Sequence, residues 1–460
     1  MKFLFDSWTD TIVAQITPNG IGAVGMIRIS GISTFKIVNH LFPSKNIEIL
    51  PSHTLHVGYL KFGEELIDQV VLSLFKSPNS YTGEDVIEIS CHGSPFILER
   101  VITILIENGC RMAKPGEFTQ RAFLNNKFNL AEAESVADLI ESNTKASASA
   151  ALNVLRGGFK HDLASLREQL LTFSALIELE LDFAEEDVLF ADRTHLLELV
   201  SKTLNQVSHL CDSFKYGNVV KKGISVAIIG TPNAGKSTLL NSLLNENRAI
   251  VSNIPGTTRD TIEETLNIDG ILFRLVDTAG LRLHSHDVIE NLGIERSLAQ
   301  MNSADIVLYL FDINEYSTES LKIVVEDFKL KSHKFLLVGN KIDLSLKDYD
   351  SHFKDYSPIT FISAKSKVNI HKLKTDLYKL ALGGLVHTES TIITNVRHYE
   401  ALYKLSANLN DVISGLKDNL SGDLISLHIR ECLHHLGLIT GEVSNEEQLD
   451  YIFSKFCIGK

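Results

Sequence analysis

The stretch Gly230-Thr-Pro-Asn-Ala-Gly-Lys236-Ser237 follows the apolar run 224–229 and precedes the helix-like segment 238–244. Its glycines let backbone N–H groups curl around an anion, and the N-terminus of the following helix adds a positive potential. The Lys236 ammonium can reach terminal phosphates, and the Ser237 hydroxyl can bind Mg²⁺. With a strand before it and a helix after it, the stretch predicts a phosphate-binding loop in an α/β domain.

Three further motifs each follow a strand-like run. Asp277-Thr-Ala-Gly280 follows residues 271–276, Asn340-Lys341-Ile342-Asp343 follows residues 335–338, and Ser363-Ala364-Lys365 follows residues 359–362. Ligands of doubly wound α/β sheets bind at the C-terminal ends of the strands. In order and spacing, the set resembles the GTPase signature.

That resemblance implies a role for each motif. Asp277 would hold Mg²⁺ through water, Gly280 would contact the γ-phosphate, and Asp343 would accept from the guanine N1–H and amino group, an edge that adenine lacks. The stretch Thr257-Thr258-Arg259-Asp260 is similar to a first switch, with Thr258 as a Mg²⁺ ligand beside Ser237. The predicted GTP contacts are Asn233, Ala234, Gly235, Lys236, Ser237, Thr238, Ser252, Asn253, Ile254, Pro255, Gly256, Thr257, Thr258, Asp277, Thr278, Ala279, Gly280, Asn340, Lys341, Asp343, Ser363, Ala364 and Lys365.

The bulk composition is that of a soluble protein of several domains. The chain has 460 residues, of which 44% are hydrophobic and 22% charged, and its formal net charge is −13. The negative charge argues against a protein that coats nucleic acid electrostatically, although it leaves room for a local basic site. Five scattered cysteines without metal-ligand spacing favour a reducing cytoplasm. We expect neither a signal peptide nor a membrane-spanning segment.

The order of patterns along the chain predicts a multidomain fold. Short β-rich runs at 12–16, 24–29, 55–60, 70–75 and 86–90, with one helix at 95–107, predict an α+β N-terminal domain over residues 1–125. Helical spacing begins near residue 130, continues at 163–181, and resumes at 394–435. We therefore expect an all-α domain in two halves, 126–220 and 383–460, with an α/β P-loop GTPase domain, 221–382, inserted between them. Two separate helical domains are the alternative.

The hydrolytic machinery departs from that of many GTPases. Leu281 follows the Asp-x-x-Gly motif where a water-orienting Gln is common, and leucine cannot hydrogen-bond. Asn233 could instead bind a monovalent cation beside the phosphates, or it could satisfy only the backbone of its own turn.

Together these residues resemble the MnmE (TrmE) family of tRNA-modification GTPases, over essentially the whole chain. The matching segments are Asp10-Thr-Ile-Val-Ala-Gln15, Gly25-Met-Ile-Arg-Ile-Ser-Gly31, Tyr81-Thr-Gly-Glu-Asp85, Glu88, Pro115-Gly-Glu-Phe118, Arg121-Ala-Phe-Leu124, Ala131-Glu-Ala-Glu134 and Cys457-Ile-Gly-Lys460.

The resemblance implies a K⁺-dependent GTPase in which two GTPase domains meet across their nucleotides. Asn233, Ser252, Ile254 and Thr257 would supply oxygens to K⁺. Glu290 would position the attacking water, with Asp287 as the alternative. Pro255 stands where relatives have a small residue.

The resemblance also implies that the N-terminal domain binds folate, as 5,10-methylenetetrahydrofolate or its analogue 5-formyltetrahydrofolate. Arg28, Glu88, Lys127 and Lys460 match the folate-contacting positions. A carboxylate can accept from the amino-pyrimidine edge of a pterin, while Arg and Lys suit anionic groups. By sequence alone each of these side chains would be an exposed charge.

Cys457 matches a cysteine that the family needs for tRNA modification. A prenylation signal is excluded because Gly459 is not aliphatic and the last residue is Lys460. A small buried apolar role is the other interpretation.

The family further implies a homodimer formed through the N-terminal domain and a complex with MnmG, which carries FAD and uses NADH. Together they would add an aminomethyl or carboxymethylaminomethyl group at C5 of the wobble uridine of certain tRNAs. The two rival hypotheses are a regulatory or ribosome-assembly GTPase without chemistry of its own and a stand-alone folate aminomethyltransferase.

Overall fold

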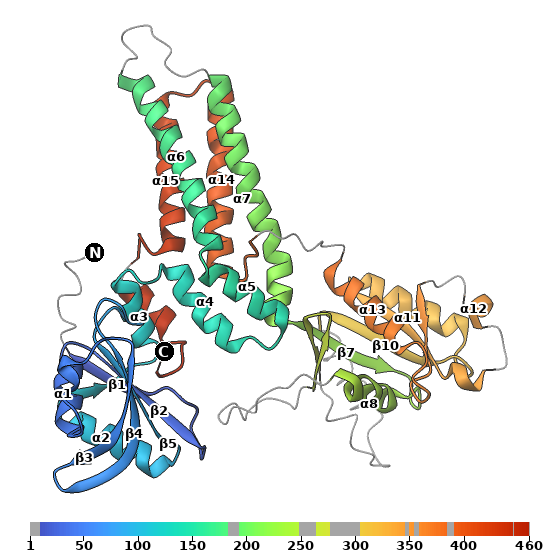
Figure 1. Cartoon of the computed structure of the whole chain (residues 1–460). Helices are drawn as coiled ribbons and strands as arrows, with labels where there is room; N and C mark the ends of the chain where they lie inside the picture. Colours follow the sequence, from blue (N-terminus) through green and yellow to red (C-terminus); the bar gives the residue numbers. More distant parts are fainter. Residues whose placement is uncertain are drawn as a thin grey trace. The chain divides into compact units, whose positions relative to one another are not determined.

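The computed structural model (Figure 1) describes residues 10–182, 193–247, 264–276, 304–345, 349–353, 358–383, 391–444 and 446–459. Its internal contacts divide the chain into two compact units. Unit 1 comprises residues 1–137, 154–175 and 426–460, and unit 2 comprises residues 138–153 and 176–425. Each unit is described by itself.

Unit 1 is built on a six-stranded sheet with the order β3-β4-β5-β2-β1-β6. All neighbouring strands are antiparallel except β1 and β6, which are parallel. The sequence predicts β1 to β5 and misses β6, because three residues are too few to show an alternating pattern. The strands are β1 (Thr11–Gln15), β2 (Val24–Ser30), β3 (Thr54–Phe62), β4 (Glu65–Phe75), β5 (Val86–His92) and β6 (Cys110–Met112).

The helices α1 (Thr34–Leu41) and α2 (Pro95–Glu107) contribute to the same hydrophobic core as this sheet, and a 3-10 turn, η1 (Ile47–Ile49), follows α1. Strand alternation decides which side chains face them: Ile27, Ile29, Ile87 and Ile89 are fully buried in that core. Side chains of the alternate positions, Arg28 and Glu88, therefore lie on the opposite face. The sequence predicts α2 with its observed bounds and misses α1.

The helices of unit 1 outside its sheet are, in whole or in part, α3 (Glu117–Leu124), α4 (Leu130–Glu141), α6 (Gly158–Asp182), α15 (Gly422–Thr440) and α16 (Glu446–Phe453). The start of α4 is a capping box, in which the Asn129 side chain accepts from Glu132 N and the Glu132 carboxylate accepts from Asn129 N, each at 2.7 Å. The predicted helices at 131–140 and 163–181 correspond to α4 and α6.

Unit 2 contains a second six-stranded sheet, with the order β12-β11-β10-β7-β9-β8. All neighbours are parallel except β8 and β9. The chain passes from β7 to β9 on one side and to β10 on the other, so a topological switch point lies beside β7. The strands are β7 (Ile224–Gly230), β8 (Glu264–Ile268), β9 (Ile271–Leu275), β10 (Ile306–Asp312), β11 (Phe335–Asn340) and β12 (Ile359–Phe361).

The sequence predicts four of these strands and misses β8 and β10. Every residue of β10 is buried, and a continuous apolar run of this length does not distinguish a strand from a buried helix. The helical segments of this part are α8 (Lys236–Asn247), α11 (Thr318–Leu330), η3 (Ile342–Leu344), α12 (Tyr349–His352) and α13 (Ile370–Leu382).

The remaining helices of unit 2 are α5 (Lys145–Leu155), α7 (Arg193–Lys222) and α14 (Val396–Lys417), and α7 packs along α14. The helical region predicted at 394–435 corresponds to two helices, α14 and α15, because the chain turns between Lys417 and Gly422 with Asn419 at φ 56°. The sequence does not single out α7. No helix among the described residues is long and apolar enough to span a bilayer.

Candidate functional site

The predicted phosphate loop has the expected strand-loop-helix geometry. It connects β7 to α8, and Lys236 is the first residue of that helix. The Lys236 ammonium donates to the backbone oxygens of Gly230, at 3.0 Å, and Thr231, at 2.8 Å. Burial lowers the pKa of Lys236 because a desolvated ammonium is disfavoured. A polyphosphate at the loop would supply the charge that stabilises this cation.

Asn340 connects two of the predicted motifs to the phosphate loop. Its side-chain Nδ2 donates to Ala234 O at 2.7 Å, and its Oδ1 accepts from Ala364 N at 2.9 Å. The loop comes so close that a Cβ on Gly235 would lie 2.5 Å from Asn340 Nδ2. The structure therefore brings together the three described motifs, although Ala234 and Asn340 lie 106 residues apart in sequence.

Asp343 lies in η3, directly after Asn340 and Lys341, and its side chain is exposed. Lys341 has a left-handed backbone, with φ 70°. Its ammonium lies 2.7 Å from Asp312 Oδ2. Asp312 is the last residue of β10 and pairs with Asn340 of β11. The turn after β10 thus contacts the segment that presents Asp343.

Many of the predicted nucleotide and cation contacts lie outside the described residues. They are Ser252, Asn253, Ile254, Pro255, Gly256, Thr257, Thr258, Asp277, Thr278, Ala279, Gly280, Glu290 and its alternative Asp287. Lys460 of the folate set is outside as well. Among the described residues no group of three or more His, Cys, Asp and Glu could hold a metal ion.

In unit 1, the structure brings Arg28 and Glu88 together on the face of the sheet away from α1 and α2. Arg28 Nε donates to Glu88 Oε1 at 2.9 Å, and Nη2 lies 2.8 Å from the same oxygen. The guanidinium carbon lies 4.9 Å from the centroid of the Tyr81 ring and 5.6 Å from that of Phe118. Among the described residues, no acceptor reaches the buried Nη1 atom of Arg28.

Lys127 is connected to this pair through Tyr81. Its ammonium donates to Pro78 O at 2.8 Å, and both Lys127 and Tyr81 line an open cavity of about 600 Å³. The Tyr81 hydroxyl bonds to the Thr119 hydroxyl at 2.8 Å, and burial raises the pKa of Tyr81. Tyr81 thus contacts Arg28 and shares a cavity with Lys127, while Glu88 pairs with Arg28.

The segment with Cys457 packs on unit 1. Gly116 N donates to Cys457 O at 3.4 Å. Gly459 has φ 94°, and a Cβ on it would lie 2.5 Å from Gln15 O. Because Gln15 pairs with Ile27, the neighbour of Arg28, this segment reaches the sheet beside the predicted folate residues.

Cys457 is the one exposed thiol among the five cysteines, all of which are described. Burial raises the pKa of Cys91 to about 11 and that of Cys110 to about 12. Burial likewise raises the pKa of Cys211 to about 11. The thiol that the sequence singles out is therefore the accessible one.

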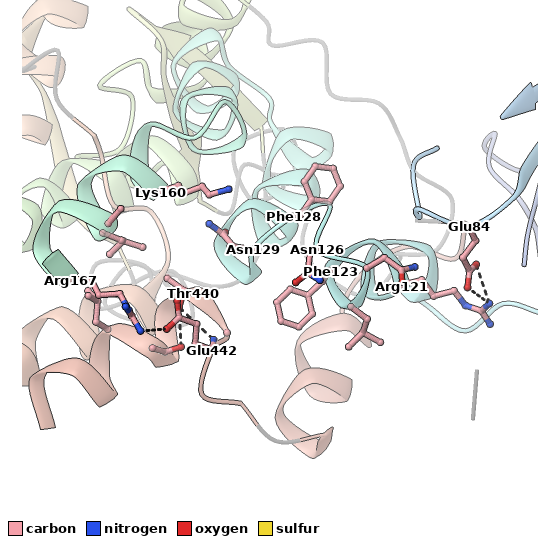
Figure 2. A pocket seen from close by; sticks show the side chains of 17 residues that line it. Glu84, Arg121, Phe123, Asn126, Phe128, Asn129, Lys160, Arg167, Thr440 and Glu442 are labelled. Atoms are coloured by element: carbon pink, nitrogen blue, oxygen red, sulfur yellow. Dashed lines mark hydrogen bonds and ion pairs between the residues drawn. The ribbon is translucent and has the colours of Figure 1, made fainter. Parts of the chain in front are cut away.

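A larger cavity of about 780 Å³ also lies in unit 1 (Figure 2). It is bounded by residues 123–129, α6 and the end of α15, and none of the predicted folate residues lines it. Figure 2 shows Lys160 and Arg167 on one side and the rings of Phe123 and Phe128 on the other. Each cation has a carboxylate nearby, Glu132 at 3.9 Å and Glu442 at 3.3 Å. The lining therefore offers little net charge to an anion.

Sequence reasoning missed Tyr81, Phe118 and Asp312 as site residues. Tyr81 and Phe118 stand within segments that carry the family resemblance, but their contacts with Arg28 depend on the sheet. Asp312 is the last residue of β10, a strand that the sequence did not predict, so no sequence signal indicated that it pairs with Asn340.

Comparisons with known proteins cover nearly all of the chain. The family model of the GTP-binding protein TrmE N-terminus matches residues 11–127, and the model of the MnmE helical domain matches residues 130–457. The tRNA modification GTPase MnmE of Cytophaga hutchinsonii is 50% identical over 452 residues, 98% of this chain and 98% of the relative. The protein of the same description from Flavobacterium johnsoniae is 49% identical over 463 residues, 98% of this chain and 99% of the relative.

Among solved structures, the G domain of the T. maritima FeoB iron transporter is 24% identical and covers 34% of this chain and 98% of its own, with a TM-score of 0.26. The family assignment rests on the full-length relatives and the two family models, and this partial likeness adds nothing to it.

Proposed function

Because the chain belongs to the MnmE (TrmE) family, whose members are described as tRNA modification GTPases, we propose that it modifies tRNA and that GTP hydrolysis drives a conformational change in this process. The observation that carries the proposal is 50% identity extending over 98% of both chains. As a member of this family, the chain is a GTP hydrolase.

GTP and Mg²⁺ would bind at the carboxyl end of the sheet in unit 2. The phosphate loop and Lys236 would hold the polyphosphate, and Asp343 would accept from guanine. Ser237 and Thr258 would be the protein ligands of Mg²⁺, which neutralises charge on the phosphates. The connection from Ala234 through Asn340 to Ala364 supports this arrangement, since it links the phosphate side to the base side.

K⁺ would complete the hydrolytic site. Asn233 is exposed in the phosphate loop with φ 59°, so its amide oxygen is free to reach a cation there. Ser252, Ile254 and Thr257 would add oxygens, and Glu290 would position the attacking water. GTP turnover should be much faster in KCl than in NaCl, and Glu290→Ala should lower the rate with nucleotide affinity nearly unchanged. Equal rates in the two salts would remove K⁺ from the proposal.

A tetrahydrofolate carbon donor would bind on the face of the sheet in unit 1 that carries Arg28 and Glu88, opposite α1 and α2. The residues fit such a ligand: the buried Nη1 of Arg28 needs an acceptor, and Glu88 Oε2 is available to accept from a pterin edge. Lys127 and Lys460 would meet anionic groups. When bound, 5,10-methylenetetrahydrofolate supplies the carbon that is transferred.

Folate binding can be tested directly by titrating 5-formyltetrahydrofolate into the protein and its variants. Arg28→Ala should weaken binding at least tenfold. Arg100→Ala is the matched control, since Arg100 pairs with Glu65 at the surface of the same unit. Equal affinities of the two variants and the natural protein would contradict the assignment.

The full reaction would require a partner. We propose a homodimer that joins an FAD-carrying MnmG protein and adds an aminomethyl or carboxymethylaminomethyl group at C5 of the wobble uridine, with Cys457 in the shared site and the cytoplasm as location. Purified chain, MnmG, tRNA, 5,10-methylenetetrahydrofolate, NADH, GTP and an ammonium salt should yield the aminomethyl nucleoside. Unmodified tRNA under these conditions would favour a regulatory GTPase.

The domain plan that we propose is residues 1–125, 126–220, 221–382 and 383–460, with the third inserted in a helical domain formed by the second and fourth. It is supported by the return of the chain after α13 to α7, where Ile393 N donates to the Ser213 hydroxyl at 3.1 Å. A family model of the helical domain that extends across residues 130–457 agrees with it.

A further inference from the structure

The turn after β10 encloses Lys341 from two directions. Asp312 Oδ2 lies 2.7 Å from the Lys341 ammonium, while Asn314 Nδ2 lies 3.4 Å from the Lys341 carbonyl oxygen. Asp312 Oδ1 in turn accepts from Asn314 N and Nδ2, both at 3.0 Å. Both ends of Lys341 are thus connected to a single carboxylate and its neighbouring amide.

The surroundings of Asp312 keep its carboxylate ionised. Its side chain is only 7% exposed, and that of Lys341 is 28% exposed. Burial alone raises the pKa of Asp312, but the Lys341 ammonium and the Asn314 donors outweigh it and hold the pKa below its usual value. The carboxylate is therefore charged at neutral pH, and losing one partner would leave the other charge partly buried.

Lys341 needs such support because of its backbone. A left-handed conformation is strained for a residue that has a Cβ atom, and Lys341 adopts it with φ 70°. Its carbonyl also accepts from Leu344 N at 3.0 Å, which closes the turn that carries Asp343. The direction of Asp343 therefore depends on Lys341 keeping this conformation.

We propose that Asp312, together with Asn314, is a positioning residue for guanine recognition, which holds Lys341 in its left-handed turn so that Asp343 faces the base. The proposal rests on the proposed role of Asp343 as the guanine acceptor. Asp312 itself does not touch the nucleotide. It acts on affinity and base selectivity and leaves the hydrolysis step unchanged.

The test compares binding of GDP and IDP, because inosine lacks the 2-amino group from which Asp343 would accept a hydrogen bond. In the natural protein GDP should bind tighter than IDP. Asp312→Asn should weaken GDP about tenfold, leave IDP less affected, and so reduce the ratio of the two Kd values, with kcat at saturating GTP within twofold. Asp327→Asn is the matched control, because Asp327 forms an exposed ion pair with Lys331 on α11 at 2.8 Å.

A double-mutant cycle shows whether Asp312 acts through Lys341. In a Lys341→Met background, Asp312→Asn should change the GDP affinity by less than twofold. A change in this background as large as in the natural background would overturn the proposal. The proposal would also be overturned if the single variant Asp312→Asn left both Kd values unchanged, or if it weakened GDP and IDP by the same factor.

Asp343→Ala separates this inference from the assignment beneath it. If Asp343→Ala reduces the GDP preference and Asp312→Asn does not, Asp312 has no positioning role. If Asp343→Ala leaves the preference intact, the guanine assignment itself is wrong. The unfolding temperature of each variant, measured without nucleotide, shows whether a loss of affinity is caused only by unfolding of the variant.

Discussion

The Lys236 ammonium is partly buried among backbone groups, and this burial disfavours its charged form. Its folded-state pKa is lowered, so at neutral pH the ammonium opposes folding relative to an unfolded chain in which it is hydrated. The two backbone oxygens that accept from it compensate in part. We therefore expect Lys236 to contribute to ligand binding and not to the stability of the free protein.

Replacing Lys236 by Met should accordingly separate stability from binding. Hydrogen bonds from a cation to phosphate contribute about 1.5–3 kcal/mol, so Lys236→Met should weaken GTP about 10- to 100-fold or more. Thermal unfolding of the nucleotide-free variant should occur at the same or a higher temperature than in the natural protein. Lys331→Met, at the exposed residue that follows α11, should leave both quantities unchanged. A lower unfolding temperature for Lys236→Met would show that the lysine stabilises the free loop.

At the level of elements, the last described helix is held to unit 1 by a close backbone approach. Gly116, with φ 69°, precedes α3, and a Cβ on it would lie 2.5 Å from Phe453 O at the end of α16. The phenyl rings of Phe453 and Phe123 lie with their centroids 6.4 Å apart in the same contact. The glycine therefore allows the segment with Cys457 to dock.

Gly116→Ala should release this segment. The added methyl group both strains the left-handed backbone and collides with Phe453 O, a combined cost of about 2–4 kcal/mol. Hydrogen exchange of residues 446–459 should become faster, while GTP turnover stays unchanged. Gly63→Ala carries a similar backbone strain at φ 60° with no atom within 4 Å, so it serves as the control. Equal exchange in the two variants would contradict the docking role of Gly116.

A second connection between elements is a buried ion network around α3. Glu117 accepts from Arg111 at 2.6 Å and from Arg121 at 3.0 Å, and Arg121 also pairs with Asp10 at 2.7 Å. Burial raises the pKa of Glu117, but these donors and Lys114 N outweigh it and hold the pKa below its ordinary value of 4.5. The network joins β1, β6 and α3.

Glu117→Gln should therefore destabilise unit 1 in a pH-dependent way. Breaking a buried pair costs about 3–5 kcal/mol at pH 7. Because the folded-state pKa is lowered, the stabilisation is complete above the unfolded pKa of 4.5 and is lost as pH falls through the lower folded value. Calorimetry at pH 7 and below pH 4 should show that the variant and the natural protein differ less in their free energy of unfolding at acidic pH. If the difference in stability between the variant and the natural protein did not depend on pH, the ionised Glu117 would not be its cause. The control Glu107→Gln should be as stable as the natural protein at both pH values.

The elements also show where sequence reasoning succeeds. Strands with alternating burial, such as β2 and β5, and an amphipathic helix with a proline at its start, α2, are visible in the sequence because local pattern and tertiary role agree. The fully buried β10 and the three-residue β6 lack a periodic signal.

The same distinction holds for the sites. The phosphate loop and Asn340 could be chosen from motifs, because their chemistry is local, whereas Arg28 and Glu88 could be chosen only from the family resemblance. Asp312 and Tyr81 act through strand register and side-chain packing, which the sequence does not display.

At the scale of the whole molecule, one chain carries the proposed GTP site in unit 2 and the proposed one-carbon site in unit 1. The exposed Cys457 also lies in unit 1, in a segment that contacts β1, the strand next to the one that carries Arg28. We therefore expect variants of the two sites to be separable: changes at Arg28 or Cys457 should stop tRNA modification and leave GTP hydrolysis intact.

The measurement that tests the central claim most directly is mass spectrometry of tRNA nucleosides from cells that lack this gene, complemented with the natural gene, with Cys457→Ser, or with Cys211→Ser as a control. We predict that the wobble-uridine modification disappears in the deletion, that the natural gene and Cys211→Ser restore it, and that Cys457→Ser does not. An unchanged nucleoside profile in the deletion, with no second pathway present, would contradict tRNA modification and leave a regulatory GTPase.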